Sequence, residues 1–255
     1  MWTVEEEISL LNFLKKVVGG ACSVKGIKRS IDNRGAYVNG RLERFASRRL
    51  KVGDRVEFDF KAEEKPTEAL NLYEDEHLLV IDKPSGWLCE EKAIRQKLGN
   101  VWLVHRLDKE TSGVLLLAKT SEAKNQLESL FFERKIEKRY LALVHGAMLR
   151  NEGKIESPIK TKSASTSWKC LKKGKSLSLL ECSPYTGRTH QIRIHLRQIG
   201  HPILGDLLYG LRRNEKGVQR LLLHAHRLQF KHPFSHEELS FEAPIPTEIL
   251  GASFD

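Results

Sequence analysis

One stretch decides the fold: Val104-His105-Arg106-Leu107-Asp108-Lys109-Glu110-Thr111-Ser112-Gly113-Val114-Leu115-Leu116-Leu117-Ala118-Lys119-Thr120. Its second half, from Val114 to Ala118, is a short apolar run, which is typical of a buried strand. Its first half is dense in charged and polar side chains, which are costly to leave unpaired beside a buried strand. The simplest interpretation is a turn in which Asp108 caps a backbone amide. Charged side chains at the mouth of a buried strand usually have a task, so a functional loop is the other interpretation.

The same string resembles the catalytic motif of the RluA-type pseudouridine synthases, through His105-Arg106-Leu107-Asp108, Thr111-Ser112-Gly113 and the apolar run. The resemblance implies that Asp108 is the catalytic carboxylate. It also implies that Arg106 enters the gap left by a flipped-out nucleotide, or contacts that nucleotide. The expected fold class is α+β, with a central, mainly antiparallel mixed sheet flanked by helices and loops.

Other motifs of that family lie before and after this stretch, at residues 78–86, 138–146, 186–196 and 221–230. In the second of them the resemblance implies that Tyr140 packs against the target uracil, since a phenol offers a stacking face and a polar hydroxyl. Without the motif, a core tyrosine would be the simpler interpretation. The resemblance makes Lys138, Arg188 and Gln191 phosphate or base contacts.

Arg193 lies in the alternating string Gln191-Ile192-Arg193-Ile194-His195-Leu196. If this segment starts as an extended chain, Arg193 points to the polar side with Gln191 and His195. In the family geometry that side faces Asp108. An arginine neighbour stabilises an ionised carboxylate, which the chemistry requires.

The N-terminal part predicts two helices, over residues 3–20 and 23–33, then a strand with an Asn39-Gly40 hairpin turn, and within residues 50–58 a Gly53-Asp54 turn followed by an alternating strand. This pattern resembles the S4 RNA-binding domain. Its basic residues Lys25, Lys28, Arg29 and Arg34 would face phosphates. A small basic domain with a structural role is the alternative. We expect residues 1–62 to form this domain, the charged segment 63–72 to be a linker, and 73–255 to form the catalytic domain.

The composition favours a polyanionic partner. The chain has 43 Lys and Arg against 33 Asp and Glu, a net charge of +10, and the excess is clustered in residues 21–55 and 154–175. This distribution suits nucleic acid binding. There is no apolar run long enough for a membrane span, and the first residues are acidic, unlike a signal peptide. With four scattered cysteines, free thiols in a reducing cytoplasm are expected. A monomer is the default expectation for the oligomeric state.

The chemistry implied is the conversion of uridine to pseudouridine. The N1–C1′ bond breaks, the uracil turns while held, and C5 bonds to C1′. A carboxylate beside C1′ stabilises the positive charge on the sugar, as in glycosidases, after the nucleotide leaves its stack. There is no redox step, so no cofactor is expected. His190, His195 and His201 match no zinc spacing, so no metal is expected either. Structured RNA is the expected partner, large-subunit ribosomal RNA first and transfer RNA second.

Two other functions stay open on the sequence. An RNA-binding or ribosome-assembly protein with an inactive synthase fold would be indicated by loss of Asp108, Tyr140 or Arg193, and all three are present. A nucleoside hydrolase or glycosidase would need a second acid or a metal site. The catalytic motif has Asp108 as its candidate acid, surrounded by basic residues.

Overall fold

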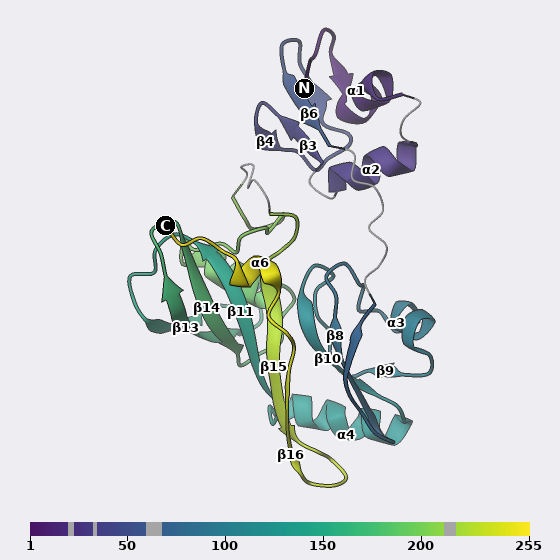
Figure 1. The fold of residues 1–255 in the computed structure, drawn as a ribbon, viewed down its shortest axis with the longest axis vertical. Helices are drawn as coiled ribbons and strands as arrows, with labels where there is room; N and C mark the ends of the chain where they lie inside the picture. The colour runs from purple at the N-terminus through teal and green to yellow at the C-terminus, as the bar shows by residue number, and fades with distance from the viewer. Residues whose placement is uncertain (20–22, 33–34, 60–67, 212–217) are drawn as a thin grey trace. The chain divides into compact units, whose positions relative to one another are not determined.

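The computed structural model describes residues 1–19, 23–32, 35–59, 68–211 and 218–255 (Figure 1). The chain divides into two compact units, Met1–Lys65 with Leu211–Gln219, and Pro66–Gly210 with Arg220–Asp255. No helix among the described residues is long and apolar enough to cross a membrane.

The first unit packs two short helices against small sheets. Its larger sheet has the order β1-β6-β3-β4, and β2 pairs with β5. Buried Leu10, Phe13, Leu14, Ile27 and Ile31 join the helices to the strands. The elements are β1 (Trp2–Thr3), β2 (Ile8–Ser9), α1 (Leu10–Val17), α2 (Val24–Asp32), β3 (Ala36–Val38), β4 (Arg41–Leu42), β5 (Arg49–Leu50) and β6 (Arg55–Phe58).

Three local predictions for this unit can be compared with these elements. Both helices exist, but the first is shorter than 3–20, because Trp2–Thr3 and Ile8–Ser9 are strands. The Asn39-Gly40 turn is confirmed, with φ of 52° and 72°, the signs that a type I′ hairpin turn requires. The side chain of Asn39 also donates to the Asp54 carboxylate at 2.8 Å.

The second unit is built on a ten-stranded mixed sheet, which confirms the predicted fold class for this part. The main path is β12-β13-β14-β11-β15-β10-β8-β7, with β16 paired to β15 and β9 to β10. The described ladders are antiparallel except for β10 with β15. The strands are β7 (Leu70–Glu74), β8 (Leu78–Lys83), β9 (Trp102–Leu103), β10 (Ser112–Ala118), β11 (Glu137–His145), β12 (Glu152–Glu156), β13 (Ser165–Lys173), β14 (Leu177–Pro184), β15 (Leu223–Lys231) and β16 (Glu238–Glu242). The helices are α3 (Glu91–Leu98), α4 (Ser121–Phe132), α5 (Gln191–Gln198) and α6 (Thr247–Leu250).

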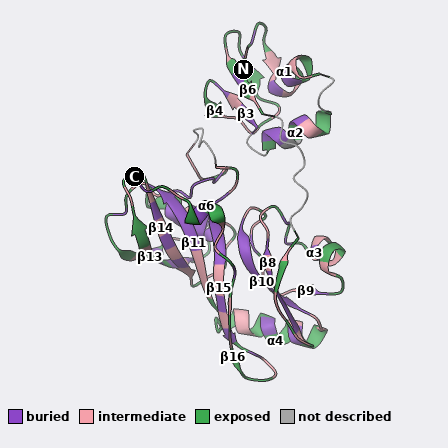
Figure 2. Cartoon of the chain, viewed as in Figure 1, coloured by how far each residue is buried: buried purple, intermediate pink, exposed green. Residues whose placement is uncertain are grey.

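Strand β10 confirms the prediction of a buried strand at the centre of the fold. Each of its residues is buried, and Figure 2 shows it in purple. Val114, Leu116 and Ala118 pack with α4 on one face, while Leu115 and Leu117 pack with Ile94 of α3 on the other. Since successive side chains point to opposite faces, a strand covered on both faces is apolar without a break.

One predicted boundary in this unit was wrong. The linker was expected to reach residue 72, but Leu70–Glu74 is strand β7, hydrogen-bonded to β8. Its residues are exposed or half-buried, as is usual for a strand at the edge of a sheet, and a boundary drawn from composition overlooks such a strand. Helix α4 is capped by Thr120, since the Thr120 hydroxyl accepts from the Ala123 amide at 3.1 Å.

Candidate active site

Asp108 lies in the loop between β9 and β10, at the mouth of the central strand. Buried Leu107 anchors the loop, and the Thr111 amide closes a turn on the Asp108 carbonyl at 3.1 Å. The Asp108 carboxylate itself contacts Arg193 and His190, so its role is not that of a backbone cap. Gly113 brings the loop down onto β15: its φ is +114°, and a Cβ there would lie 2.2 Å from the Ala225 carbonyl oxygen.

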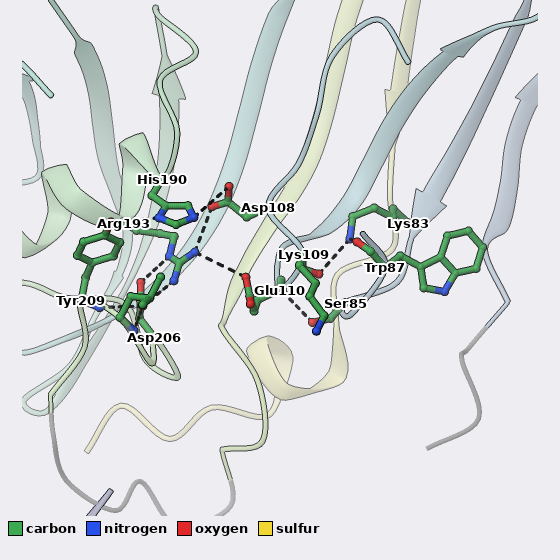
Figure 3. Close-up of polar contacts among 11 residues, drawn as sticks. Lys83, Ser85, Trp87, Asp108, Lys109, Glu110, His190, Arg193, Asp206 and Tyr209 are labelled. Carbon is green, nitrogen blue, oxygen red and sulfur yellow. Dashed lines mark hydrogen bonds and ion pairs between the residues drawn. The ribbon is translucent and has the colours of Figure 1, made fainter. Parts of the chain in front are cut away.

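Arg193 reaches Asp108 from helix α5. Its Nη1 lies 3.3 Å from Oδ2 of Asp108, while its side chain is 2% exposed (Figure 3). The expectation of an extended segment was wrong, because the helix begins directly after His190, whose backbone is left-handed with φ 57°. The pairing with Asp108 nevertheless exists, since the first turn of the helix points the guanidinium at the loop.

Asp206 is the principal site residue that sequence analysis missed. Its two carboxylate oxygens accept from Nε and Nη2 of Arg193, each at 2.8 Å. The same carboxylate accepts from the amides of Leu208 and Tyr209 at 2.8 and 3.0 Å. Such two-point contact fixes the plane of a guanidinium. Arg193 is therefore aligned from one side by Asp206 and presents its remaining edge to Asp108.

Arg193 and Asp206 shift each other's pKa values so that both side chains stay charged. Burial on its own would raise the pKa of Asp206, but the hydrogen bonds and charge of Arg193 outweigh burial and lower it. Burial likewise opposes the charge on Arg193, yet Asp206 and then Asp108 raise the pKa of the guanidinium above its usual range. Arg193 is thus a permanent cation beside the Asp108 carboxylate.

A second group faces Asp108 from the same region. Nε2 of His190 lies 3.8 Å from Oδ1 of Asp108, and Nδ1 lies 3.1 Å from the Tyr209 hydroxyl. The Tyr209 ring also lies under the Arg193 guanidinium, 5.4 Å from Cζ. Because Asp206 holds the Tyr209 amide, one buried carboxylate organises both groups that contact Asp108.

Tyr140 and Lys138 lie on β11, where the ladder with β15 shifts register between Arg139 and Tyr140. Burial, reinforced by the negative charge of Asp108, raises the pKa of Tyr140, so the phenol stays protonated at neutral pH. Burial lowers the pKa of Lys138, whose Nζ lies 5.9 Å from the Phe131 ring centroid.

His105 is an anchor rather than a proton carrier. Its Nε2 accepts from the Leu116 amide at 2.9 Å, and its ring stacks on Phe131 with centroids 4.7 Å apart. Burial lowers the pKa of His105 to about 3, so the ring is neutral at physiological pH. This fits the acceptor role of Nε2.

The other predicted contacts separate into surface and interior groups. Arg106 is exposed and lines the cleft over Asp108, and Arg188 lines it while donating to the Ser163 carbonyl at 3.1 Å. Gln191 is 4% exposed. Its amide donates to Ser165 and Thr166 and accepts from the Thr186 hydroxyl and the Arg188 amide. The structure therefore gives Gln191 a role in holding the loop.

In the first unit, Lys25 and Lys28 are exposed on α2. The side chain of Arg29 and the whole of Arg34 lie outside the described residues. Within the part of the chain that is described, no group of three or more His, Cys, Asp or Glu could hold a metal ion. His195 is hydrogen-bonded to Thr166 and Ser157, and His201 to the His145 carbonyl.

A cleft of about 1160 Å³ opens over Asp108, Tyr140 and Arg193. It exceeds the roughly 300–1,000 Å³ of a small-molecule pocket. Eight basic side chains line it against the acidic Asp108, Glu137 and Glu238; they are Arg106, Arg134, Lys135, Lys138, Lys154, Arg188, Arg193 and Lys231. Thr111 and Ser165 also line it, and their hydroxyls are buried without a hydrogen-bond partner in the described structure. The size and the positive charge of the cleft suit an RNA strand.

Lys83, at the end of β8, is hydrogen-bonded to the loop that carries Asp108, and sequence analysis also missed it as a site residue. It is 0% exposed, and its Nζ donates to the carbonyls of Pro84, Trp87 and Lys109 at 2.9, 3.1 and 3.3 Å (Figure 3). The Ser85 hydroxyl adds a bond to the Glu110 carbonyl at 2.7 Å. These contacts tie the Pro84–Trp87 turn to the loop that carries Asp108.

We expect Lys83→Met to destabilise the protein by about 2–5 kcal/mol, because three buried carbonyls lose a charged donor. Urea unfolding of the full chain measures the loss. Lys109→Met, an exposed neighbour in the same loop, is the matched control and should change stability by less than about 0.5 kcal/mol. Equal stability of the Lys83 variant and the wild type would show that these hydrogen bonds do not stabilise the fold.

The pH dependence of this contribution has a definite sign. Burial lowers the pKa of Lys83 to about 8 in the folded protein, against about 10.4 when unfolded. Between these values the unfolded chain binds more protons, so stability rises with pH. The stability difference between wild type and Lys83→Met should therefore be constant below pH 8 and increase above it. A difference that shrinks between about pH 8 and pH 10 would contradict this assignment.

Comparison with known proteins places these features in context. Residues 77–198 match the family model described as RNA pseudouridylate synthase. The chain is 37% identical over 210 residues to ribosomal large subunit pseudouridine synthase C of Vibrio cholerae, covering 70% of this chain and 66% of that protein. To the protein of the same name from Vibrio parahaemolyticus it is 34% identical, covering 80% and 79%. The human RNA Pseudouridylate Synthase Domain Containing 1 structure superposes with a TM-score of 0.62 at 26% identity, covering 72% of this chain and 86% of that one.

Proposed function

Because this chain belongs to the RNA pseudouridylate synthase family, we propose that it isomerises uridine to pseudouridine in large-subunit ribosomal RNA, with Asp108 acting at C1′ of a flipped-out nucleotide. Transfer RNA is the second candidate substrate. The observation that supports the proposal best is the 3.3 Å contact between Asp108 and a buried arginine at the floor of a basic cleft.

The roles follow from the contacts. Cleaving the N1–C1′ bond builds positive charge on the sugar, and the Asp108 carboxylate stabilises it or bonds to it. Arg193 orients that carboxylate by a contact at 3.3 Å. Tyr140 offers its ring to the detached uracil, and its protonated hydroxyl acts as a hydrogen-bond donor. The uracil is retained, so one acid in the cleft suffices, where hydrolysis by a pair of acids would release the base.

The N-terminal unit is proposed to bring the substrate to the cleft. We propose residues 1–62 as an S4-like RNA-binding domain and the part of the chain from strand β7 (Leu70–Glu74) onward as the catalytic domain. The support is charge: Lys25 and Lys28 are exposed on α2, and contacts of such residues with phosphates position RNA without reading its sequence. Arg29 and Arg34 belong to the same proposal, as do Arg106, Lys138 and Arg188 in the catalytic part.

Mapping pseudouridines in total RNA from a deletion strain tests the function and names the substrate. We expect pseudouridine to be lost at one or a few uridines of large-subunit ribosomal RNA. Wild-type protein supplied from a plasmid should restore it, whereas Asp108→Asn should not. Unchanged pseudouridine at every position of ribosomal and transfer RNA would refute the proposal.

A further inference from the structure

The rim of the cleft carries an exposed tyrosine covered by an arginine from another element. Tyr185, at the end of β14, is 61% exposed. The guanidinium carbon of Arg134, just past the end of α4, lies 4.5 Å from the centroid of its ring. Both residues line the cleft that contains Asp108. An aromatic face and a guanidinium plane are the two surfaces on which proteins stack nucleotide bases.

Arg134 stands at a backbone position that favours glycine. The Lys135 amide bonds to the Leu130 carbonyl at 2.9 Å and the Arg134 amide to the Phe131 carbonyl at 3.2 Å, which is the Schellman ending of a helix. The residue at that point is left-handed, with φ of 60° for Arg134. A side chain there costs backbone strain that glycine avoids. The residue at this strained position is nevertheless an arginine, and its side chain lines the cleft.

Neither side chain is committed to another partner. Within the described parts of the chain, Arg134 has no ion pair and the Tyr185 hydroxyl has no hydrogen bond. Tyr185 is nevertheless fixed, since its amide donates to the Ser165 carbonyl at 2.9 Å. Ser165 also lines the cleft, and its hydroxyl is buried without a hydrogen-bond partner in the described parts of the chain. An aromatic face and a cation therefore lie together at the rim, beside Ser165.

We propose that Tyr185 and Arg134 form a binding site for one RNA base next to the flipped-out uridine, stacked between the phenol ring and the guanidinium. The inference rests on the proposed function for the identity of the polymer. A base needs one stacking layer, about 3.5 Å, so Arg134 moves outward by that distance. An exposed cation–π contact changes an equilibrium by a factor of roughly two to five, and base stacking by roughly five to 150. Replacing the direct Arg134–Tyr185 contact by a base stacked between the two side chains is therefore favourable.

The ring is tested by binding of a fluorescein-labelled oligouridylate to the full chain. Tyr185→Leu keeps apolar bulk but removes the ring, and we expect it to weaken binding by about ten-fold or more. Tyr185→Phe keeps the ring and should bind within about two-fold of the wild type, because stacking needs no hydroxyl. Wild-type affinity in Tyr185→Leu, or equal losses in both variants, would overturn the role of the ring.

The cation is tested by a substitution that relieves strain. Arg134→Gly removes the left-handed penalty, so its thermal stability should equal or exceed that of the wild type, while oligouridylate binding weakens by about three-fold or more. Lys160→Gly is the matched control: it also replaces an exposed left-handed cation, with φ of 57°, but lies outside the cleft lining. Equal weakening by both substitutions would show general charge rather than a site, and would overturn the proposal.

Tritium release from RNA labelled at C5 of uridine separates this proposal from the proposed function. In Tyr185→Leu we expect the half-saturating RNA concentration to rise more than the single-turnover rate falls, which a distorted catalytic site would not produce. A fall in rate alone would overturn the binding role. If the wild type releases no tritium from any RNA while the Tyr185 and Arg134 variants still lose oligouridylate binding, the base site stands and the synthase function fails.

Discussion

Asp108→Asn should lower tritium release from C5-labelled uridine RNA by at least about a thousand-fold and leave RNA affinity within about three-fold of the wild type. Asparagine has the shape of aspartate, and its amide oxygen still accepts from Arg193, so the loop keeps its geometry. What the variant lacks is the negative charge beside C1′ of the target nucleotide. Gel-shift titration with the same RNA measures the affinity.

Glu110→Gln is the matched control, because it makes the same acid-to-amide change beside the same arginine. Oε2 of Glu110 lies 3.7 Å from Nη1 of Arg193, but the side chain is 44% exposed, against 17% for Asp108. We expect its tritium release to stay within about three-fold of the wild type, because the reaction needs one carboxylate. Comparable losses from both substitutions would indicate a two-acid mechanism and revive the hydrolase alternative. Full activity in Asp108→Asn would refute the assignment of the catalytic acid.

The centre of the fold was predictable because its signal is local. Val114 to Ala118 is apolar without interruption, and the structure buries both faces of β10. The polar half of the same stretch predicted a site, since charged side chains at the mouth of a buried strand need partners. What the stretch does not contain is the identity of the partners of Asp108, which are His190 and Arg193; the second of these lies 85 residues further on.

Helix α5 shows why a short alternating segment misleads. Ile192, Ile194 and Leu196 fit a strand of period two, but Ile192 and Leu196 are also one helical turn apart. In the structure both are buried on the helix, together with Gln191 and His195, which repeat the same spacing. The left-handed residue that starts the helix is His190, and no cap residue marks it in the sequence. Tertiary packing, and not the local sequence, determines that this segment is a helix.

Asp206 and Lys83 were missed for a related reason. Each is an ordinary charged residue in the sequence, one after a glycine and one before a proline. What distinguishes them is complete burial with full hydrogen bonding: Asp206 takes four donors and Lys83 donates to three carbonyls. The partners of Asp206 include a residue 13 positions away, and those of Lys83 one 26 positions away. Only the folded chain brings them together.

Removing Arg193 should damage stability and catalysis at once, through different neighbours. Arg193→Met is expected to lower the free energy of unfolding by about 3–5 kcal/mol, because the Asp206 side chain, 0% exposed, is left as an unpaired buried charge. Tritium release should fall by about a hundred-fold or more, because Asp108 loses the cation that orients it. Urea unfolding and single-turnover release measure the two effects separately.

Adding Asp206→Asn to Arg193→Met distinguishes the two losses. The second substitution removes the stranded charge, so we expect about 1–3 kcal/mol of stability to return. Activity should not return, because Asp108 still lacks its cation. In the wild-type background, Asp206→Asn alone should lower both stability and rate, since it releases one edge of the guanidinium. Stability losses that simply add in the double variant would show that Asp206 is not the counter-charge of Arg193. Recovery of activity together with stability would show that Arg193 supports the fold and not the reaction.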